Sequence, residues 1–480
     1  MKILLCFVLV MIIVSVFYIF LAKYKNRRLK PDYYEDYYKK QDTVPEGKVG
    51  IFVTGLIMPE KMEFPFFYNI TLKIFNAIIP WPFRLLSKFD KGVALLDPVK
   101  YHEHEEFTPT QLVDQYGNDS DIDGEPFIEK YKKGEVVWAP PSKRIYLDHG
   151  YFLYTGHKAG LPSLSGKTMN KARIWYYNHG IKQQKLPHWQ GSFAVIDGAL
   201  EKVRSKYAAI ESRAESSLDY YKMKKKLFEL LNAGCETIVL SAPMAIYSHF
   251  EEFNSSFRHS MDYINEWKAE NPTKKVKVIM APPMGHFQPM RQAFIEMLKD
   301  RLDTLPKNAS VTVAVTVHGM PWDHFSWEAW LELAPQYRDK LAEDVQALLK
   351  AYTFSKTKVV VCQDEFADPV WDPKEKYLST NRAYLQAKQD GYDYVIGLPI
   401  EFFAENSDTL FHHALKNYHG FDGYDVYEQI DYPDWSIPYT REFQLGKTRI
   451  IYNGVPVGKY QKYVIEALYQ SLDAVLSKKN

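Results

Sequence analysis

The hydrophobic and polar positions of this chain follow two alternating patterns from about residue 215 onward. Short apolar runs such as Thr237-Ile-Val-Leu-Ser241 predict buried strands, and longer stretches with a helical period separate them. This alternation predicts βαβ units, parallel sheets and right-handed crossovers. We expect an α/β fold with two doubly wound, Rossmann-like domains. The predicted strands are 49–55, 237–241, 276–280, 311–317, 358–362 and 394–398, and the predicted helices are 216–233, 257–270, 288–302, 327–352, 374–389 and 459–476.

The same patterns predict how the chain divides. Residues 64–89 are rich in Phe, Ile, Trp and Pro, which predicts either a core helix or an apolar lip in the lipid headgroup zone. Residues 101–150 have weak periodicity and are interpreted as loops or an insertion. The expected domains are a transmembrane anchor at 1–26, a polar linker at 27–47, Rossmann-like domains at 48–270 and 271–445, and a C-terminal strand and helix at 446–480 that pack back on the body.

The N-terminus differs in kind from the rest of the chain. Residues 3–22 contain 20 residues without a charge, enough to span a bilayer as a helix. Positive charges follow in Lys23-Tyr-Lys-Asn-Arg-Arg28, and no small-residue cleavage pattern is present. A retained signal anchor is therefore favoured over a removed signal peptide. Because positive charge flanks the inner side of such helices, we expect a single-pass membrane protein with a cytoplasmic body.

Composition narrows the classes of partner and cofactor. The 480-residue chain has a net charge of +1, which gives no global field for nucleic acid. Its three cysteines, Cys6, Cys235 and Cys362, have no CxxC or finger spacing. We therefore expect neither a disulfide framework nor an iron–sulfur cluster, and no tightly bound cofactor.

Ionisable groups cluster after the apolar run Tyr394-Val-Ile-Gly-Leu-Pro-Ile400. Glu405, Asp408 and His412 stand at i, i+3 and i+7, a spacing that places them on one face of a helix, and Glu401 extends the same stripe. Such a row could share a cation or pass protons. Open α/β sheets place their chemistry at the carboxyl ends of strands, so the stripe predicts a site there.

Other strand ends carry further candidate side chains. His318 follows a buried run and precedes a glycine, where a histidine can be a neutral ligand or a proton acceptor. A structural, hydrogen-bonded histidine is the alternative interpretation. The remaining candidates are Tyr247 and Ser248 after one strand, Gln363 and Trp371 after another, and Thr54 and Gly55 after the first.

Taken together, these strand ends resemble the ferrochelatases, which insert ferrous iron into protoporphyrin IX. Val315-Thr-Val-His-Gly-Met-Pro321 is similar to the family's Ser-Ala-His-Ser-Leu-Pro strand end. Pro243-Met-Ala-Ile-Tyr-Ser248 matches its Tyr-Pro-Gln-Tyr-Ser segment, and the Gln363 to Trp371 stretch matches a Gln-Ser…Pro-x-Trp segment. The run from Pro399 to His412 resembles its Pro-Ile-Gly-Phe-x-x-Asp-His-x-Glu-Thr-Leu motif. The resemblance is good from about residue 237 to 420 and poor from 64 to 233.

The resemblance implies a role for each matched position. His318 falls on the family's invariant histidine, a metal ligand or acceptor of pyrrole protons. Asp408 falls on its paired glutamate, and Glu405 on the aspartate that begins the acidic stripe. His412 replaces a third acidic residue, and Asn406 replaces a histidine, so two positions depart from the pattern. The implied substrate contacts are Tyr247, Ser248, Gln363, Trp371, Thr54 and Gly55.

Three hypotheses follow. The first is a membrane-anchored chelatase for Fe(II) and protoporphyrin IX, in which Fe(II) is a substrate and His318 and Asp408 are the metal ligands. The second is a non-catalytic protein that binds haem or another tetrapyrrole, which Asn406 and His412 favour. The third is a chelatase for another metal or tetrapyrrole. The expected partners are the porphyrin and the membrane, without nucleic acid; a homodimer and haem-pathway partners stay open.

Overall fold

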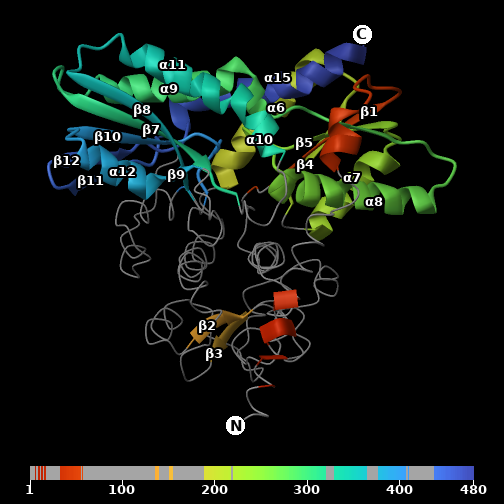
Figure 1. Ribbon diagram of the computed structural model, residues 1–480. Helices are drawn as coiled ribbons and strands as arrows, with labels where there is room; N and C mark the ends of the chain where they lie inside the picture. Colours follow the sequence, from red (N-terminus) through yellow and green to blue (C-terminus); the bar gives the residue numbers. More distant parts are fainter. Residues whose placement is uncertain are drawn as a thin grey trace. The chain divides into compact units, whose positions relative to one another are not determined.

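The computed structural model describes residues 33–55, 57, 189–217, 220–320, 329–364, 377–406, 409 and 437–479. It also describes the backbone of 136–139 and 151–154, and eight residues between 6 and 17. The chain divides into two compact units. One contains Met1–Pro31, Lys61–Leu186 and Asp323–Ser326, and the other contains Asp32–Glu60, Pro187–Trp322 and Trp327–Asn480. The second unit carries both large sheets (Figure 1).

The first sheet has four parallel strands in the order β4-β1-β5-β6. Every residue of β1 is buried, as expected for a central strand covered on both faces. β6 belongs to this sheet because it pairs with β5, so the predicted domain boundary at 270/271 is too early. The strands are β1 (Val49–Gly55), β4 (Glu211–Ser216), β5 (Thr237–Ser241) and β6 (Lys277–Met280).

The second sheet has six strands in the order β11-β12-β10-β7-β8-β9. All neighbours are parallel except β11, which pairs with β12 in the antiparallel direction. The first eight residues of β7 are buried, and only His318 at its end is partly exposed. The strands are β7 (Ser310–His318), β8 (Lys356–Asp364), β9 (Leu378–Ser379), β10 (Tyr394–Pro399), β11 (Arg441–Leu445) and β12 (Thr448–Tyr452).

Helices cover the sheets and join them. α15 buries Val464, Ala467, Leu468, Ser471 and Leu472, a helical spacing, and packs on α6 and α9, which confirms that the C-terminal helix returns to the body. The α-helices are α6 (Trp189–Lys206), α7 (Tyr220–Asn232), α8 (Phe257–Glu270), α9 (Gln288–Leu302), α10 (Trp330–Leu333), α11 (Arg338–Leu349), α12 (Thr380–Gln389) and α15 (Gln461–Leu476). The shorter π and 3-10 turns are η1 (Tyr33–Lys39), η4 (His249–Ser256), η5 (Met284–His286), η6 (Ala334–Gln336), η8 (Gly458–Tyr460) and η9 (Ser477–Lys479).

The predicted α/β alternation with parallel sheets is confirmed, but several elements differ from the prediction. The helix expected at 327–352 is divided into α10, η6 and α11, and Pro335 lies at the division, where it has no N–H for a continuous helix. The helix expected at 374–389 begins only at Thr380, because Ser379 caps it after β9. The insertion at 101–150 contains β2 (Val136–Ala139), which pairs with β3 (Tyr151–Tyr154) in a small antiparallel sheet.

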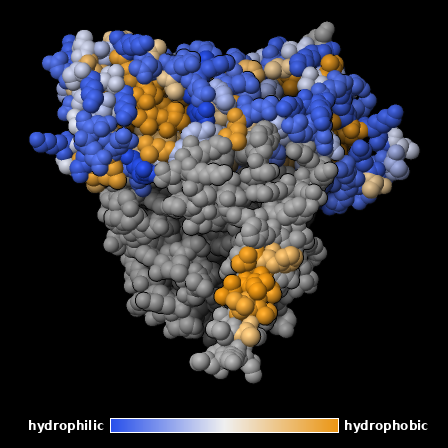
Figure 2. All heavy atoms as spheres, in the orientation of Figure 1, coloured by the Kyte–Doolittle hydropathy of each residue, from blue (hydrophilic) through white to orange (hydrophobic). Residues whose placement is uncertain are grey.

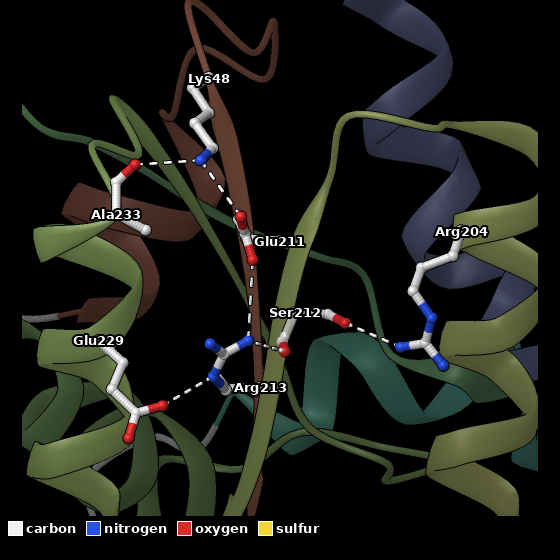
Figure 3. A network of polar contacts seen from close by, with 7 residues as sticks. All are labelled: Lys48, Arg204, Glu211, Ser212, Arg213, Glu229 and Ala233. Atoms are coloured by element: carbon white, nitrogen blue, oxygen red, sulfur yellow. Dashed lines mark hydrogen bonds and ion pairs between the residues drawn. The ribbon is translucent and has the colours of Figure 1, made fainter.

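β4 was not predicted because its sequence, Glu-Ser-Arg-Ala-Glu-Ser, lacks apolar alternation. The strand forms one edge of the first sheet, where polar side chains can bind neighbouring elements. Lys48 donates to the Glu211 carboxylate at 3.2 Å, and Arg213 donates to Glu229 of α7 at 2.8 Å. Figure 3 shows these contacts, which also include Ser212, Arg204 and Ala233.

The polar segment predicted as a linker at 27–47 is instead docked on the body from Tyr33 onward. Tyr34 is 1% exposed and its ring packs on His249 and Phe253. Gln41 exchanges two hydrogen bonds with the backbone of Met280, so it closes the free edge of β6. We call residues 33–46 the strap. It is held by side-chain contacts that local polarity does not reveal.

The predicted anchor at 3–22 lies largely outside the described residues, as does the predicted lip at 64–89. The described residues in the first range are helical and exposed; Figure 2 shows them as an apolar surface. Within the part of the chain that is described, no helix is long and apolar enough to cross a membrane.

Gly285 marks a contact that tolerates no side chain. Its amide donates to the carbonyl oxygen of Ala245, and an added Cβ would collide with that oxygen and lie 2.7 Å from Cγ of Tyr337. We expect Gly285→Ala to lower the free energy of unfolding by about 2 kcal/mol through overpacking. Urea unfolding followed by far-UV circular dichroism measures the change.

The control is Gly191→Ala on α6, where the added Cβ would meet only Ala404 Cβ, at 3.9 Å. This variant should be as stable as the parent protein or slightly more stable, because alanine is the better helix former. Equal losses in both variants would contradict the steric explanation.

Candidate active site

The carboxyl ends of β10, β7 and β8 lie side by side in the second sheet, and each is followed by or ends in a polar residue. β7 ends at His318, whose register partner on β8 is Asp364. β10 ends at Pro399, and Glu401 comes two residues later. The hydrogen-bond ladder therefore brings a histidine and carboxyl groups together at the carboxyl ends of three neighbouring strands. This is the usual place for chemistry in open α/β sheets.

The orientation of the His318 ring follows from its hydrogen bond. Nδ1 lies 2.6 Å from the carbonyl oxygen of Gly319, and a carbonyl can only accept, so Nδ1 carries the proton. When the imidazole is neutral, Nε2 therefore carries the lone pair. The ring is half-buried and its centroid lies 6.1 Å from that of Phe402. A neutral imidazole held in this tautomer suits a metal ligand or a proton acceptor.

Glu401 is the most perturbed acid at this edge. Its side chain is 4% exposed, and both carboxyl oxygens accept from the indole Nε1 of Trp330, at 3.0 and 3.2 Å. Burial raises the pKa of Glu401 to about 8, against the opposing effects of His318, Trp330 and Arg338. The Ile400 amide, one residue earlier, donates to the carbonyl oxygen of Thr316 at 3.0 Å. Glu401 therefore lies in a segment that is bonded to the strand that ends at the predicted histidine.

Gln363 and Asp364 occupy the end of β8, and both are buried. The Gln363 amide donates to the carbonyl oxygen of Tyr377 at 3.2 Å, which ties β8 to the start of β9. The carbonyl oxygen of Asp364 accepts the Gly319 amide at 2.7 Å. The end of β8 therefore fixes the turn that follows His318.

The acidic stripe does not begin on a helix. Asn406 and Thr409 exchange the reciprocal hydrogen bonds of a capping box, so Glu405 precedes the helical start. The Glu405 carboxylate accepts from the Thr409 hydroxyl at 2.6 Å and from the Tyr439 amide at 3.3 Å. The prediction that Glu405 shares one face of a helix with Asp408 and His412 is thus wrong for Glu405, because this residue lies before the cap at Asn406. Asp408 and His412 lie outside the described residues, as does Trp371.

The other predicted contacts belong to the first sheet. Tyr247 is fully buried among Phe253 and Phe257, and its hydroxyl contacts the backbone of Ala242. Ser248 caps η4 by accepting the Glu251 amide at 2.9 Å. Thr54 and Gly55 end β1; Thr54 is buried. These residues shape the core and loops after β1 and β5, and substrate contact for them stays a prediction.

Two residues of the second-sheet edge were not predicted in their roles. Glu401 was assigned only to the helical stripe, and Trp330 was placed inside a long helix. The sequence feature that points to Glu401 is its position two residues after a buried strand. No local pattern identifies Trp330, because its partner lies 71 positions away. Among the described residues, no group of three or more His, Cys, Asp or Glu side chains could hold a metal ion.

Comparison with known proteins identifies the family of the segment that contains these residues. Residues 198–434 match the sequence profile of the ferrochelatase family, and this span contains His318, Gln363, Glu401 and Glu405. No curated protein sequence matches the chain significantly.

Among solved structures, SirB from Bacillus subtilis with Fe3+ is similar at 10% identity and a TM-score of 0.35, over 60% of this chain and 89% of that one. The Cra transcriptional dual regulator from Pseudomonas putida is similar at 14% identity and a TM-score of 0.24, over 60% and 88%. With such low scores, the assignment rests on the family profile.

The chain therefore contains a domain of the ferrochelatase family. The domain is that of a metal chelatase, a lyase that inserts a metal ion into a tetrapyrrole. The predicted family and enzyme class are confirmed.

The raised pKa of Glu401 gives a test by pH. Its folded pKa of about 8 exceeds its ordinary value, so its proton stabilises the fold fully below about pH 4.5, and this contribution is lost as pH rises through about 8. We expect metal-free protein to lose on the order of a few kcal/mol of unfolding free energy over this range, and Glu401→Gln to flatten the dependence. Urea unfolding between pH 5 and 8 measures it.

His318, Arg338 and Tyr337 are the charged or titratable groups that face this carboxyl. Glu201→Gln, on the exposed face of α6, is the control. Its free energy of unfolding should change with pH as steeply as that of the parent protein. An unchanged slope in Glu401→Gln would assign the pH dependence to other groups.

Proposed function

We propose that this protein inserts Fe(II) into protoporphyrin IX, with Fe(II) as a substrate. The main support is the fixed tautomer of His318 at the end of β7, next to the ends of β8 and β10. Metal insertion requires removal of two pyrrole protons and of water from the cation, and both steps need basic groups at the macrocycle. A neutral imidazole beside carboxyl groups meets these needs.

In this proposal, Nε2 of His318 is the metal ligand or the acceptor of a pyrrole proton. The resemblance assigns the partner role across the macrocycle to Asp408, with His412 further along the same segment. Glu405 acts differently from a freely facing acid, because its carboxylate is bonded to Thr409 and Tyr439. It joins Thr409 to the backbone of Tyr439.

The remaining predicted contacts complete the proposed site. Gln363 would contact the porphyrin from the end of β8, and Thr54, Gly55, Tyr247 and Ser248 would shape the loops of the first sheet. Trp371 is proposed as a further porphyrin contact. Histidine and carboxylate are suitable ligands for Fe(II), although geometry more than affinity selects the metal. We propose no tightly bound cofactor and no iron–sulfur cluster; burial raises the pKa of Cys362 to about 12, and it also raises that of Cys235, which disfavours thiolate ligands.

We also propose that the N-terminus anchors the body to a membrane on its cytoplasmic side. Leu9, Val10, Ile12, Ile13, Val14, Val16 and Phe17 are 42–62% exposed. Residues 12–14 are consecutive, so their side chains point to different sides of the helix. A helix that is apolar all round is typical of a lipid environment. An anchor would keep the enzyme close to porphyrins that dissolve poorly in water.

His318→Ala should abolish metallation, because no other described side chain offers an imidazole at this sheet edge. The assay follows porphyrin absorbance as purified protein is mixed with protoporphyrin IX and Fe(II) or Zn(II). The control is His259→Ala, on α8 beside the first sheet, which should keep the parent's rate. Metallation that survives His318→Ala would refute the proposed role of this residue.

A panel of Fe(II), Co(II) and Zn(II) with different tetrapyrroles tests the substrate. We expect the highest kcat/KM for Fe(II) with protoporphyrin IX. Faster insertion of Co(II) into a corrin precursor would select a chelatase for another substrate. Tight haem binding without metallation of any member would select a non-catalytic tetrapyrrole-binding protein.

The anchor is tested by Ile12→Lys combined with Ile13→Lys. Each charge near the centre of a spanning helix costs about 3 kcal/mol on insertion scales, so the protein should move from the membrane pellet to the soluble fraction. Val44→Lys is the control, because Val44 is also 45% exposed but lies in the strap. Pelleting of the double variant after carbonate extraction would argue against this anchor.

A further inference from the structure

We propose that Trp330 and Glu401 are positioning residues for His318. The indole N–H of Trp330 fixes the Glu401 carboxyl, and Glu401 belongs to the segment after β10 that is bonded to β7 two residues before His318. This inference rests on the proposed function, because it assumes that His318 receives the metal.

The turn after β7 determines where the His318 ring points. The ring bonds to the carbonyl oxygen of the next residue, Gly319, at 2.6 Å, so it follows any movement of that peptide. On one side, the Gly319 amide is held by the carbonyl oxygen of Asp364 on β8. On the other side, the Ile400 amide donates to the carbonyl oxygen of Thr316 at 3.0 Å, two residues before His318, and Glu401 follows Ile400 directly. The end of β7 and its turn are therefore held from both neighbouring strands.

Glu401 can hold the segment after β10 in place only if its own carboxyl group is held. Both of its oxygens lie within 3.2 Å of the Trp330 Nε1, and the Trp330 side chain is fully buried. A buried carboxyl that left this donor would lose its hydrogen bond without gaining one to water. The indole N–H thus selects one orientation of the carboxyl group.

Trp330 is held in turn by cation–π and edge contacts. The Arg338 guanidinium lies 5.3 Å from the centre of the indole, and the Tyr377 ring meets it edge-on at 5.8 Å. Arg338 also donates to the Tyr377 hydroxyl at 2.6 Å. Next to this cluster, Tyr337 donates to the carbonyl oxygen of Ile400 at 2.6 Å, which fixes the residue before Glu401. The cluster thus holds both Trp330 and the end of β10.

We expect loss of this positioning contact to weaken metal binding more than porphyrin binding. Outer groups that orient a metal-binding histidine typically change metal affinity or activity by about 10–100-fold. Trp330→Phe removes the donor but keeps an aromatic ring. In full-length protein without porphyrin, we expect it to weaken Co(II) binding, followed by the visible absorption of the metal, by about 10-fold or more. In the metallation assay, kcat should fall while KM for porphyrin stays within about twofold.

Trp267→Phe is a matched control. The Trp267 indole also belongs to a buried side chain and donates a hydrogen bond, to Asn232 at 2.8 Å, but it lies on α8 beside the first sheet. This variant should bind Co(II) like the parent protein. Equal weakening by both variants would show a general effect of losing an indole hydrogen bond and would overturn the proposal.

Glu401→Gln provides a second test that does not depend on the folding of Trp330→Phe. It should weaken Co(II) binding to a similar extent, because an amide keeps one acceptor oxygen where the carboxyl group has two that accept from the Trp330 indole. Since the two residues act as one unit, the double variant should lose no more Co(II) affinity than the single variant that shows the larger loss. Parent-like Co(II) affinity in either single variant, or losses that multiply in the double variant, would overturn the proposal.

His318→Ala separates this inference from the proposed function. If it leaves Co(II) binding unchanged, the assignment of His318 fails, and the positioning role fails with it. If it removes Co(II) binding while Trp330→Phe and Glu401→Gln retain it, only the positioning role is wrong.

Discussion

The parallel hydrogen-bond ladder of β10, β7 and β8 is the constraint on which the site depends. It fixes His318 opposite Asp364 and places Pro399 opposite Thr316. The Ile400 amide continues the ladder by donating to the Thr316 carbonyl oxygen, which carries β10 to the residue before Glu401. Because register in a sheet cannot slip by one residue without exposing the core, the relative positions of these side chains are set by the whole sheet.

A buried carboxyl group beside this ladder is unfavourable unless it is protonated or well bonded. Glu401 meets this condition with the donor of Trp330, and its raised pKa favours the neutral form. Perturbed acids of this kind concentrate at functional sites, although structural networks also contain them. Here the same bonds that stabilise the buried carboxyl group connect α10 to the segment after β10, so stability and site geometry share one set of contacts.

The edges of the first sheet are protected in two different ways. β4 exposes charged side chains that pair with α7 and with Lys48, whereas β6 is covered by the strap through Gln41. The strap also bonds Glu332, the second residue after Trp330, through Lys39 at 3.1 Å. The segment that follows the N-terminus therefore contacts the helix that carries Trp330.

The sequence by itself determined the α/β class, most central strands and His318, because buried parallel strands are continuous apolar runs and a polar residue that ends one stands out. It did not predict β4, whose polar residues are stabilised by partners outside the strand, or the strap, whose tyrosines look like a linker. Only the tertiary structure placed Glu405 before a helix cap and turned Glu401 toward Trp330. Local periodicity records how often a residue faces the core, but the partner of a buried polar group can lie anywhere in the chain.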